Sequence, residues 1–268
     1  FLVGPAISFK DYTTFTTRTV PPSPSASVTR SPTQGRFTDI PDLSSRVSRV
    51  LGTLSVAAPW AVLHITCRKW DYHSLLVPHP LWRAVAAGTV TRAKFYAAWK
   101  STQAACELIG LDSGENISIT GVEAPHAPRD VAVHWNKATA VWLREQVYMR
   151  LPRAAVLATF LCSALWHGFH VGQYIFFIVF AGWSLCGRVL RRRMRGVFCV
   201  DGWAGWYDAA GVLATRVSMD VIAAPFMLKG WDECVRYMQA SVWGVVVAGM
   251  IGIVMLDALV PRQHRKKE

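Results

Sequence analysis

The chain has 268 residues, of which 52% are hydrophobic and 17% charged, and its formal net charge is +12. A mean hydropathy of +0.24 is high for a soluble domain, and 12 tryptophans suit a protein with aromatic belts at two membrane interfaces. The basic residues gather at the ends of apolar stretches, most densely at residues 188–195 and 262–267. That placement fits cytoplasmic flanks and anionic lipid headgroups better than a nucleic acid, so we expect a lipid bilayer and no nucleic-acid partner.

The first half of the chain contains a linker and two helical stretches. Residues 19–41 are rich in proline, serine and threonine, which predicts a flexible loop. Residues 50–66 are apolar and bounded by arginines, and they are nearly long enough to span a membrane, with Pro59 as a kink. Residues 81–111 show a helical apolar pattern interrupted by basic residues, which predicts one or two partly embedded helices.

The next stretch is more polar. Residues 112–129 contain glycine and proline and are predicted to form a loop. Asn116 begins an Asn-Ile-Ser sequon there, which would accept a glycan only if the loop were lumenal. Residues 136–150 are predicted to form one amphipathic helix that could lie in the membrane interface, ended by Pro152.

A long apolar run follows at residues 154–187. As one straight helix its 34 residues would measure about 50 Å, whereas a hydrocarbon core is about 30 Å thick. The run must therefore bend, break or pass twice through the membrane. Gly168 and Gly172 favour a break just after His167, and broken helices are tolerated at membrane depth where they line a cavity.

Two further apolar stretches cover residues 209–228 and 241–256. The first contains Arg216 and Asp220, whose spacing allows them to pair on one helix face. If the basic stretches 188–195 and 262–267 both face the cytoplasm, two spans must lie between them, and these two apolar stretches supply that number. The sequence therefore predicts an all-α, polytopic transmembrane protein with broken or re-entrant helices.

In the run up to residue 187, His167 and His170 are the only basic side chains, and the run has no acidic ones. A histidine in hydrocarbon is costly unless it packs with a partner or faces a water-filled cavity, so a purely structural role is one interpretation of His167. A general base is the other, because imidazole titrates near neutral pH. The six cysteines show no metal-ligand spacing, so we expect neither a structural metal site nor a disulfide framework.

Three motifs occur in order: Trp135-Asn136, then Trp142-Leu143-Arg144, then "SALWHG" ending at Gly168. This order resembles the membrane-bound O-acyltransferase family, and within it the lysophospholipid acyltransferases. "FLVGPAISFKDY" at the start and "KFYAAWKSTQAACELIGL" at 94–111 add to the resemblance, which covers residues 1 to about 180. The chain departs from the family pattern at Gln103, where glutamate is frequent, and at Gln173, which delays Tyr174 by one position.

The resemblance implies that residues 1–268 are the C-terminal portion of a single domain of this family, built around a buried catalytic chamber. It implies transfer of a fatty acyl chain from acyl-CoA to the hydroxyl of a lysophospholipid, in the endoplasmic reticulum and without a cofactor. His167 would be the general base and Asn136 its partner. The candidate substrate-binding residues are Trp135, Trp166, His170, Arg144 and Tyr174.

Each of these residues also has a plain structural interpretation. Asn136 could be a helix N-cap, Arg144 could belong to a solvated face rather than bind CoA phosphates, and the tryptophans could be packing or interface anchors. The alternatives for the whole chain are an acyltransferase for a sterol, diacylglycerol or protein acceptor, a transporter or proton channel, and a non-catalytic membrane scaffold. A proton relay would need further intramembrane carboxylates in line with His167, and Asp220 is the main candidate.

Overall fold

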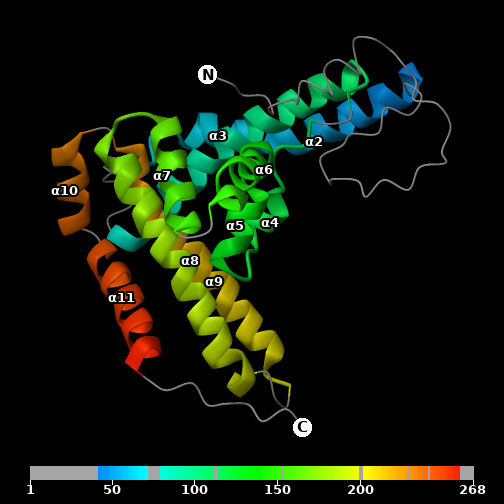
Figure 1. Ribbon diagram of the computed structural model, residues 1–268. Coiled ribbons are helices and arrows are strands. Elements are labelled where there is room, and N and C mark those ends of the chain that lie inside the picture. The colour runs from blue at the N-terminus through cyan, green and yellow to red at the C-terminus, as the bar shows by residue number, and fades with distance from the viewer. Residues whose placement is uncertain are drawn as a thin grey trace, which may run out of the picture. The chain divides into compact units, whose positions relative to one another are not determined.

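The computed structural model describes residues 42–71, 79–111, 114–151, 154–198, 202–228, 230–240 and 242–259, and their regular structure is helical throughout (Figure 1). Three helices are long and apolar enough to cross a membrane: α2 (Leu43–Cys67), α8 (Val171–Phe198) and α9 (Ala204–Met227). A fourth span results if α10 (Trp231–Ala240) and α11 (Trp243–Leu259), bent by 76° at their junction, count as one broken span. The predicted all-α, polytopic membrane architecture is confirmed. The predicted loop at 19–41 and the tail at 262–267 lie outside the described residues.

The chain forms two compact units. The first contains the described residues within 1–68, 90–119 and 133–142. In it α2 runs antiparallel to the second part of α3 (Pro80–Leu108). Thr53 near the start of α2 donates to Glu107 (2.7 Å), and the Trp60 ring meets Tyr96 further along at 4.9 Å. The stretch predicted as one or two helices is therefore one helix, and Pro59 lies inside α2.

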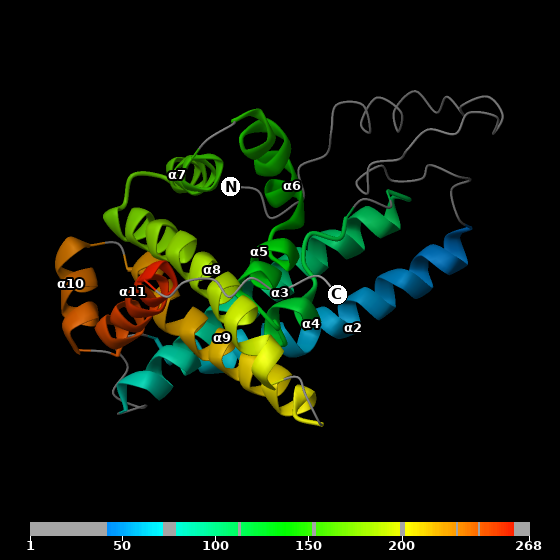
Figure 2. The same ribbon diagram turned by 60° about the horizontal axis from the view of Figure 1, so that its bottom comes forward.

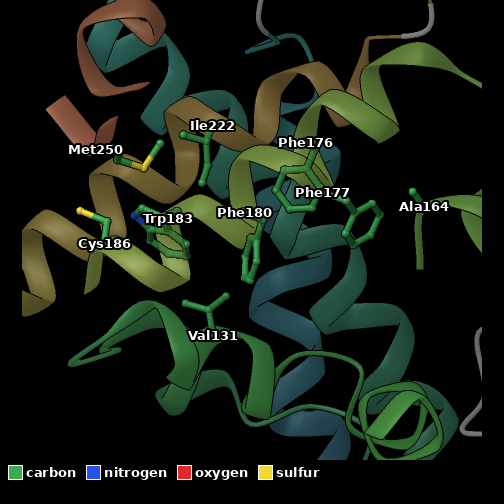
Figure 3. Packing of buried hydrophobic residues seen from close by; sticks show 9 residues of the cluster. All are labelled: Val131, Ala164, Phe176, Phe177, Phe180, Trp183, Cys186, Ile222 and Met250. Atoms are coloured by element: carbon green, nitrogen blue, oxygen red, sulfur yellow. The ribbon is translucent and has the colours of Figure 1, made fainter. Parts of the chain in front are cut away.

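The second unit contains the described residues within 69–89, 120–132 and 143–268. Its helices α8 and α9 lie side by side in both views, with α11 against α8 (Figures 1 and 2). Large aromatic side chains at helical spacing on α8 fill the space between them, and Trp183 Nε1 donates to Ser218 Oγ of α9 at 2.8 Å. Figure 3 shows the buried cluster, which consists of Val131, Ala164, Phe176, Phe177, Phe180, Trp183, Cys186, Ile222 and Met250.

Two glycines let backbones approach closely around α8. A Cβ atom at Gly172 would lie 1.9 Å from the Pro225 carbonyl oxygen of α9, and one at Gly187 would lie 2.5 Å from the ring of Pro128 in α5 (Pro128–His134). A real Cβ cannot occupy either position without moving its neighbours. These glycines therefore set the distance between α8 and the segments it packs against.

Charged groups in this unit are paired both within and between helices. Arg216 of α9 contacts Asp220 at 2.8 Å, as predicted from their spacing, and also Glu123 of α4 (Ile119–Glu123) at 2.9 Å. At the far end of α8, Arg193 donates to Asp257 of α11 at 2.7 Å, and Arg192 contacts the same carboxylate. Burying a charge is costly unless it is paired, so these contacts stabilise an otherwise apolar bundle.

Two sequence-based boundaries were wrong. The predicted loop at 112–129 contains α4 and the first residues of α5, because helices this short carry no readable periodicity. The single helix predicted for 136–150 is α6 (Lys137–Gln146) followed by a separate 3-10 turn, η1 (Tyr148–Arg150). Pro152 lies outside the described residues.

Candidate functional site

The apolar run breaks where the sequence predicted. Helix α7 (Ala155–His167) ends at His167, and α8 begins at Val171. Gly168 adopts a φ of 123°, which residues other than glycine rarely adopt, and its N–H donates to Leu165 O at 3.1 Å. The backbone therefore turns directly after His167, and the imidazole projects from the last turn of α7.

Three aromatic rings surround the imidazole of His167. Phe177 of α8 stacks on it with centroids 5.4 Å apart and an interplanar angle of 24°. Phe226 of α9 and the adjacent Trp166 meet it edge to face, each at 5.0 Å. No described residue hydrogen-bonds either ring nitrogen, and His167 remains exposed. The rings thus restrict the orientation of the imidazole while leaving both nitrogens available to a substrate.

The other candidates near the break differ in exposure. Trp166 is 52% exposed, and His170 is also exposed, with its carbonyl accepting from Gln173 N at 3.0 Å. Tyr174 packs against the buried aromatic cluster of α8. The side-chain oxygen of Gln173 is buried without a hydrogen-bond partner among the described residues and lies close to Gly168. An unsatisfied acceptor beside the break could take a hydrogen bond from a substrate hydroxyl or a water molecule.

Asn136 lies in the first unit, in the turn between α5 and α6. Its φ of 47° is left-handed, a conformation that asparagine tolerates better than most residues. The preceding Trp135 packs edge to face against Trp99 at 5.0 Å and Phe95 at 5.4 Å. In this unit Trp135 is thus a packing residue that fixes the backbone before Asn136. Arg144, in the part of α6 that belongs to the second unit, is exposed.

Asn116 was a potential glycan acceptor in the sequence, but its structural role is different. The residue is 2% exposed, and its side-chain amide bonds to Asn136 and to the backbone of Ala138. A glycosyl transfer would require this side chain to leave the fold. The contact joins residues 20 positions apart, and no local sequence pattern could have revealed it.

Within the described part of the chain, no group of three or more His, Cys, Asp or Glu side chains is placed to hold a metal ion. The described cysteines, Cys67, Cys106, Cys162, Cys186 and Cys234, are not in disulfides. The chemistry that the described site residues offer is therefore that of an imidazole, an amide and surrounding aromatic rings. These groups can accept a proton, donate hydrogen bonds and contact an apolar chain.

Comparison with known proteins adds independent information. The model of a family described as "MBOAT, membrane-bound O-acyltransferase family" matches residues 1–219. A lysophospholipid acyltransferase of Saccharomyces cerevisiae is 32% identical over 59% of this chain and 29% of the relative. Lysophospholipid acyltransferase 6 of Drosophila melanogaster is 30% identical over 69% of this chain and 28% of the relative. Human membrane-bound glycerophospholipid O-acyltransferase 1 is 24% identical over 76% of this chain. The matches span less than half the length of these three relatives, at most 44%.

Proposed function

Because the chain belongs to the membrane-bound O-acyltransferase family, we propose that it transfers a fatty acyl chain from acyl-CoA to the free hydroxyl of a lysophospholipid. The observation that carries the proposal is the exposed imidazole of His167, which projects from a helix break with neither ring nitrogen hydrogen-bonded to a described residue. The relatives named as lysophospholipid acyltransferases support the choice of acceptor.

The proposed reaction begins with a neutral His167. Its imidazole accepts the proton of the lysophospholipid hydroxyl as the hydroxyl oxygen attacks the carbonyl carbon of the thioester. The tetrahedral intermediate carries a negative oxygen, and its collapse breaks the carbon–sulfur bond and forms the ester. The imidazolium returns the proton to the departing CoA thiolate, which restores the base. A thioester is already activated towards attack, so these steps require no covalent enzyme intermediate and no cofactor.

Asn136 is proposed to assist the same reaction. Its amide has both donor and acceptor atoms, so it could fix the His167 tautomer, hold the acceptor hydroxyl or donate to the oxyanion. Arg144 is proposed to meet CoA phosphates, since its guanidinium is exposed and permanently charged. Trp166, His170 and Tyr174 are proposed to contact the lipid substrates near the break.

The surroundings of the reaction belong to the same proposal. A membrane environment would exclude the water that hydrolyses thioesters, and it would deliver the lysophospholipid laterally. The proposed compartment is the endoplasmic reticulum, with acyl-CoA entering from the cytoplasmic side. The apolar helices α2, α8 and α9 are consistent with a protein that works within the bilayer.

The test is acyl transfer by the purified full-length protein. Radiolabelled oleoyl-CoA is supplied with lysophospholipids carrying choline, ethanolamine, serine or inositol, and in parallel with cholesterol, diacylglycerol and an acceptor peptide. We expect label in at least one diacyl phospholipid and in none of the other products. Transfer to cholesterol, diacylglycerol or the peptide, with none to any lysophospholipid, would mean that the acceptor belongs to that other class. No transfer to any acceptor would contradict the enzymatic proposal and favour a transporter or scaffold.

A further inference from the structure

Asn116 makes three hydrogen bonds to the turn that carries Asn136. Its backbone carbonyl accepts from Lys137 N at 2.9 Å, and its side-chain Oδ1 accepts from Ala138 N at 3.0 Å. Its Nδ2 donates to Asn136 Oδ1 at 3.0 Å. All these groups lie in the first unit, and Asn116 is 2% exposed. A buried asparagine with its amide used on both sides is held in one orientation.

The orientation of the two side-chain amides follows from the backbone N–H of Ala138. A backbone N–H can only donate, so the N–H of Ala138 requires an oxygen and fixes the Asn116 amide with Oδ1 towards it. The Asn116 NH₂ group must then point at Asn136 and requires an acceptor there. Asn136 can offer only its Oδ1, so its own NH₂ group points away from Asn116.

The backbone on both sides of Asn136 is held as well. Trp135 is packed against Trp99 and Phe95, while the Asn136 carbonyl accepts from Ala140 N at 3.0 Å in the first turn of α6. The left-handed φ of 47° leaves Asn136 little freedom to rotate its amide by moving the main chain. Its side-chain orientation is therefore determined by Asn116.

We propose that Asn116 is a positioning residue that commits Asn136 to act as a hydrogen-bond donor in acyl transfer. This inference rests on the proposed function and narrows it. With Oδ1 of Asn136 engaged, the group left for the reaction is its NH₂, which suits the oxygen that becomes negative in the tetrahedral intermediate. Holding the donor in place before the reaction avoids reorganisation when the charge develops.

The test is the isosteric substitution Asn116→Asp in the purified full-length protein, assayed with oleoyl-CoA and the preferred lysophospholipid. The carboxylate still accepts from Ala138 N–H, and the backbone contact to Lys137 is unchanged, so the turn should keep its fold. The carboxylate at position 116 can no longer donate to Asn136 Oδ1, so the Asn136 amide should turn over and present its oxygen to the reaction instead. We expect kcat to fall about 10²–10³-fold, as when one oxyanion donor is removed, with KM for oleoyl-CoA nearly unchanged.

A pH profile separates this role from general structural support. A protonated carboxyl group has an O–H that can donate to Asn136 Oδ1 and restore its orientation. The ratio of variant to wild-type kcat should therefore rise as pH falls, while thermal unfolding stays close to wild type. The control for loss of the sequon is Ser118→Ala, which leaves the Asn116 amide in place; at equal thermal unfolding its kcat should match the wild type.

Asn136→Asp provides a second variant if Asn116→Asp does not yield folded protein. It still accepts from Asn116 Nδ2 but lacks the NH₂ group, so kcat should fall at unchanged KM. A folded variant with wild-type kcat, or one in which only KM changes, would overturn the positioning role. The proposed function would still stand in that case, because the wild-type protein would remain active. A wild-type protein inactive towards every lysophospholipid would overturn both.

Discussion

His167 and Asn136 are polar groups held in place within their own units, His167 by aromatic rings and Asn136 by a packed neighbour and a hydrogen bond from Asn116. His167 is flanked by Phe177 and Phe226, and Asn136 follows Trp135, whose ring packs against Trp99. Ring contacts orient the His167 side chain without using its hydrogen-bonding atoms, whereas at Asn136 the rings hold only the preceding residue and the hydrogen bond from Asn116 orients the amide. That arrangement suits groups that must keep a defined direction yet remain available for a substrate.

If His167 and Asn136 act at one reacting centre, the substitution Asn136→Asp should change the pH dependence of activity. An added carboxylate stabilises the imidazolium form of His167, so more of the base is protonated at neutral pH. The residual activity should therefore be recovered at higher pH, with a profile shifted by about 1–3 pH units towards alkaline values. The measurement is kcat/KM against pH for the wild type and the variant.

Asn136→Ala is the control for this shift. It removes the amide without adding a charge, so its activity should be low and its pH profile unshifted. A folded, partly active Asn136→Asp protein with the wild-type pH profile would mean that the carboxylate does not sense His167, and the proposed partnership would be rejected.

Single residues were predictable from the sequence to different degrees. His167 stood out because an ionisable group in an apolar run is rare and readable from the chain alone. Asn116 did not, because its importance depends on a left-handed turn 20 positions away. Its sequon suggested a solvent-exposed site, whereas a buried amide network uses the side chain.

Among the elements, the junction of α7 and α8 was the most predictable. Its position followed from the excess length of the apolar run and from two glycines. The structure also assigns Gly172 a second role, since its missing Cβ admits the carbonyl oxygen of Pro225. Close approach between distant segments is invisible in a local pattern, as was α4, which has only 5 residues.

Two substitutions on α8 compare a crowded glycine with an open one. In Gly172→Ala the new methyl group would meet backbone oxygens of Pro225 and Leu228, so overpacking should cost about 1–3 kcal/mol. In Gly182→Ala nothing lies within 4 Å of the added Cβ, and alanine should stabilise the helix by about 0.5–1 kcal/mol. The thermal unfolding temperature in detergent should thus fall for Gly172→Ala and stay the same or rise for Gly182→Ala. Equal unfolding temperatures would mean that α8 and α9 do not approach as closely as the structure has them.

For the whole chain, composition was sufficient to predict a helical membrane protein, and the candidate spans confirm it. The division into two compact units was not readable, because α3 and α6 each contribute residues to both. Chain order alone does not show which part of a helix packs with which neighbour. Such a division depends on contacts between residues far apart in the sequence.

Membrane orientation yields a prediction for the whole molecule. Arg193 near the end of α8 bonds to Asp257 near the end of α11, so the C-terminal ends of these helices lie at the same end of their unit. The basic stretch 188–195 forms the last turns of α8, the stretch 262–267 follows α11 in the chain, and positive charge favours the cytoplasmic side. A C-terminal epitope tag should therefore bind antibody after selective permeabilisation of the plasma membrane. Binding only after internal membranes are opened would reverse the orientation and the proposed side of acyl-CoA entry.

Replacing His167 tests the central proposal most directly. The full-length wild type and His167→Ala are purified in the same detergent, checked for equal thermal unfolding, and assayed for CoA release and phospholipid formation with oleoyl-CoA and the preferred lysophospholipid. A positioned general base contributes about 10²–10⁴-fold, so we expect kcat of the variant to fall by that factor while the protein still folds and inserts into membranes. Turnover at the wild-type rate in folded His167→Ala would contradict the assignment of His167 as the base.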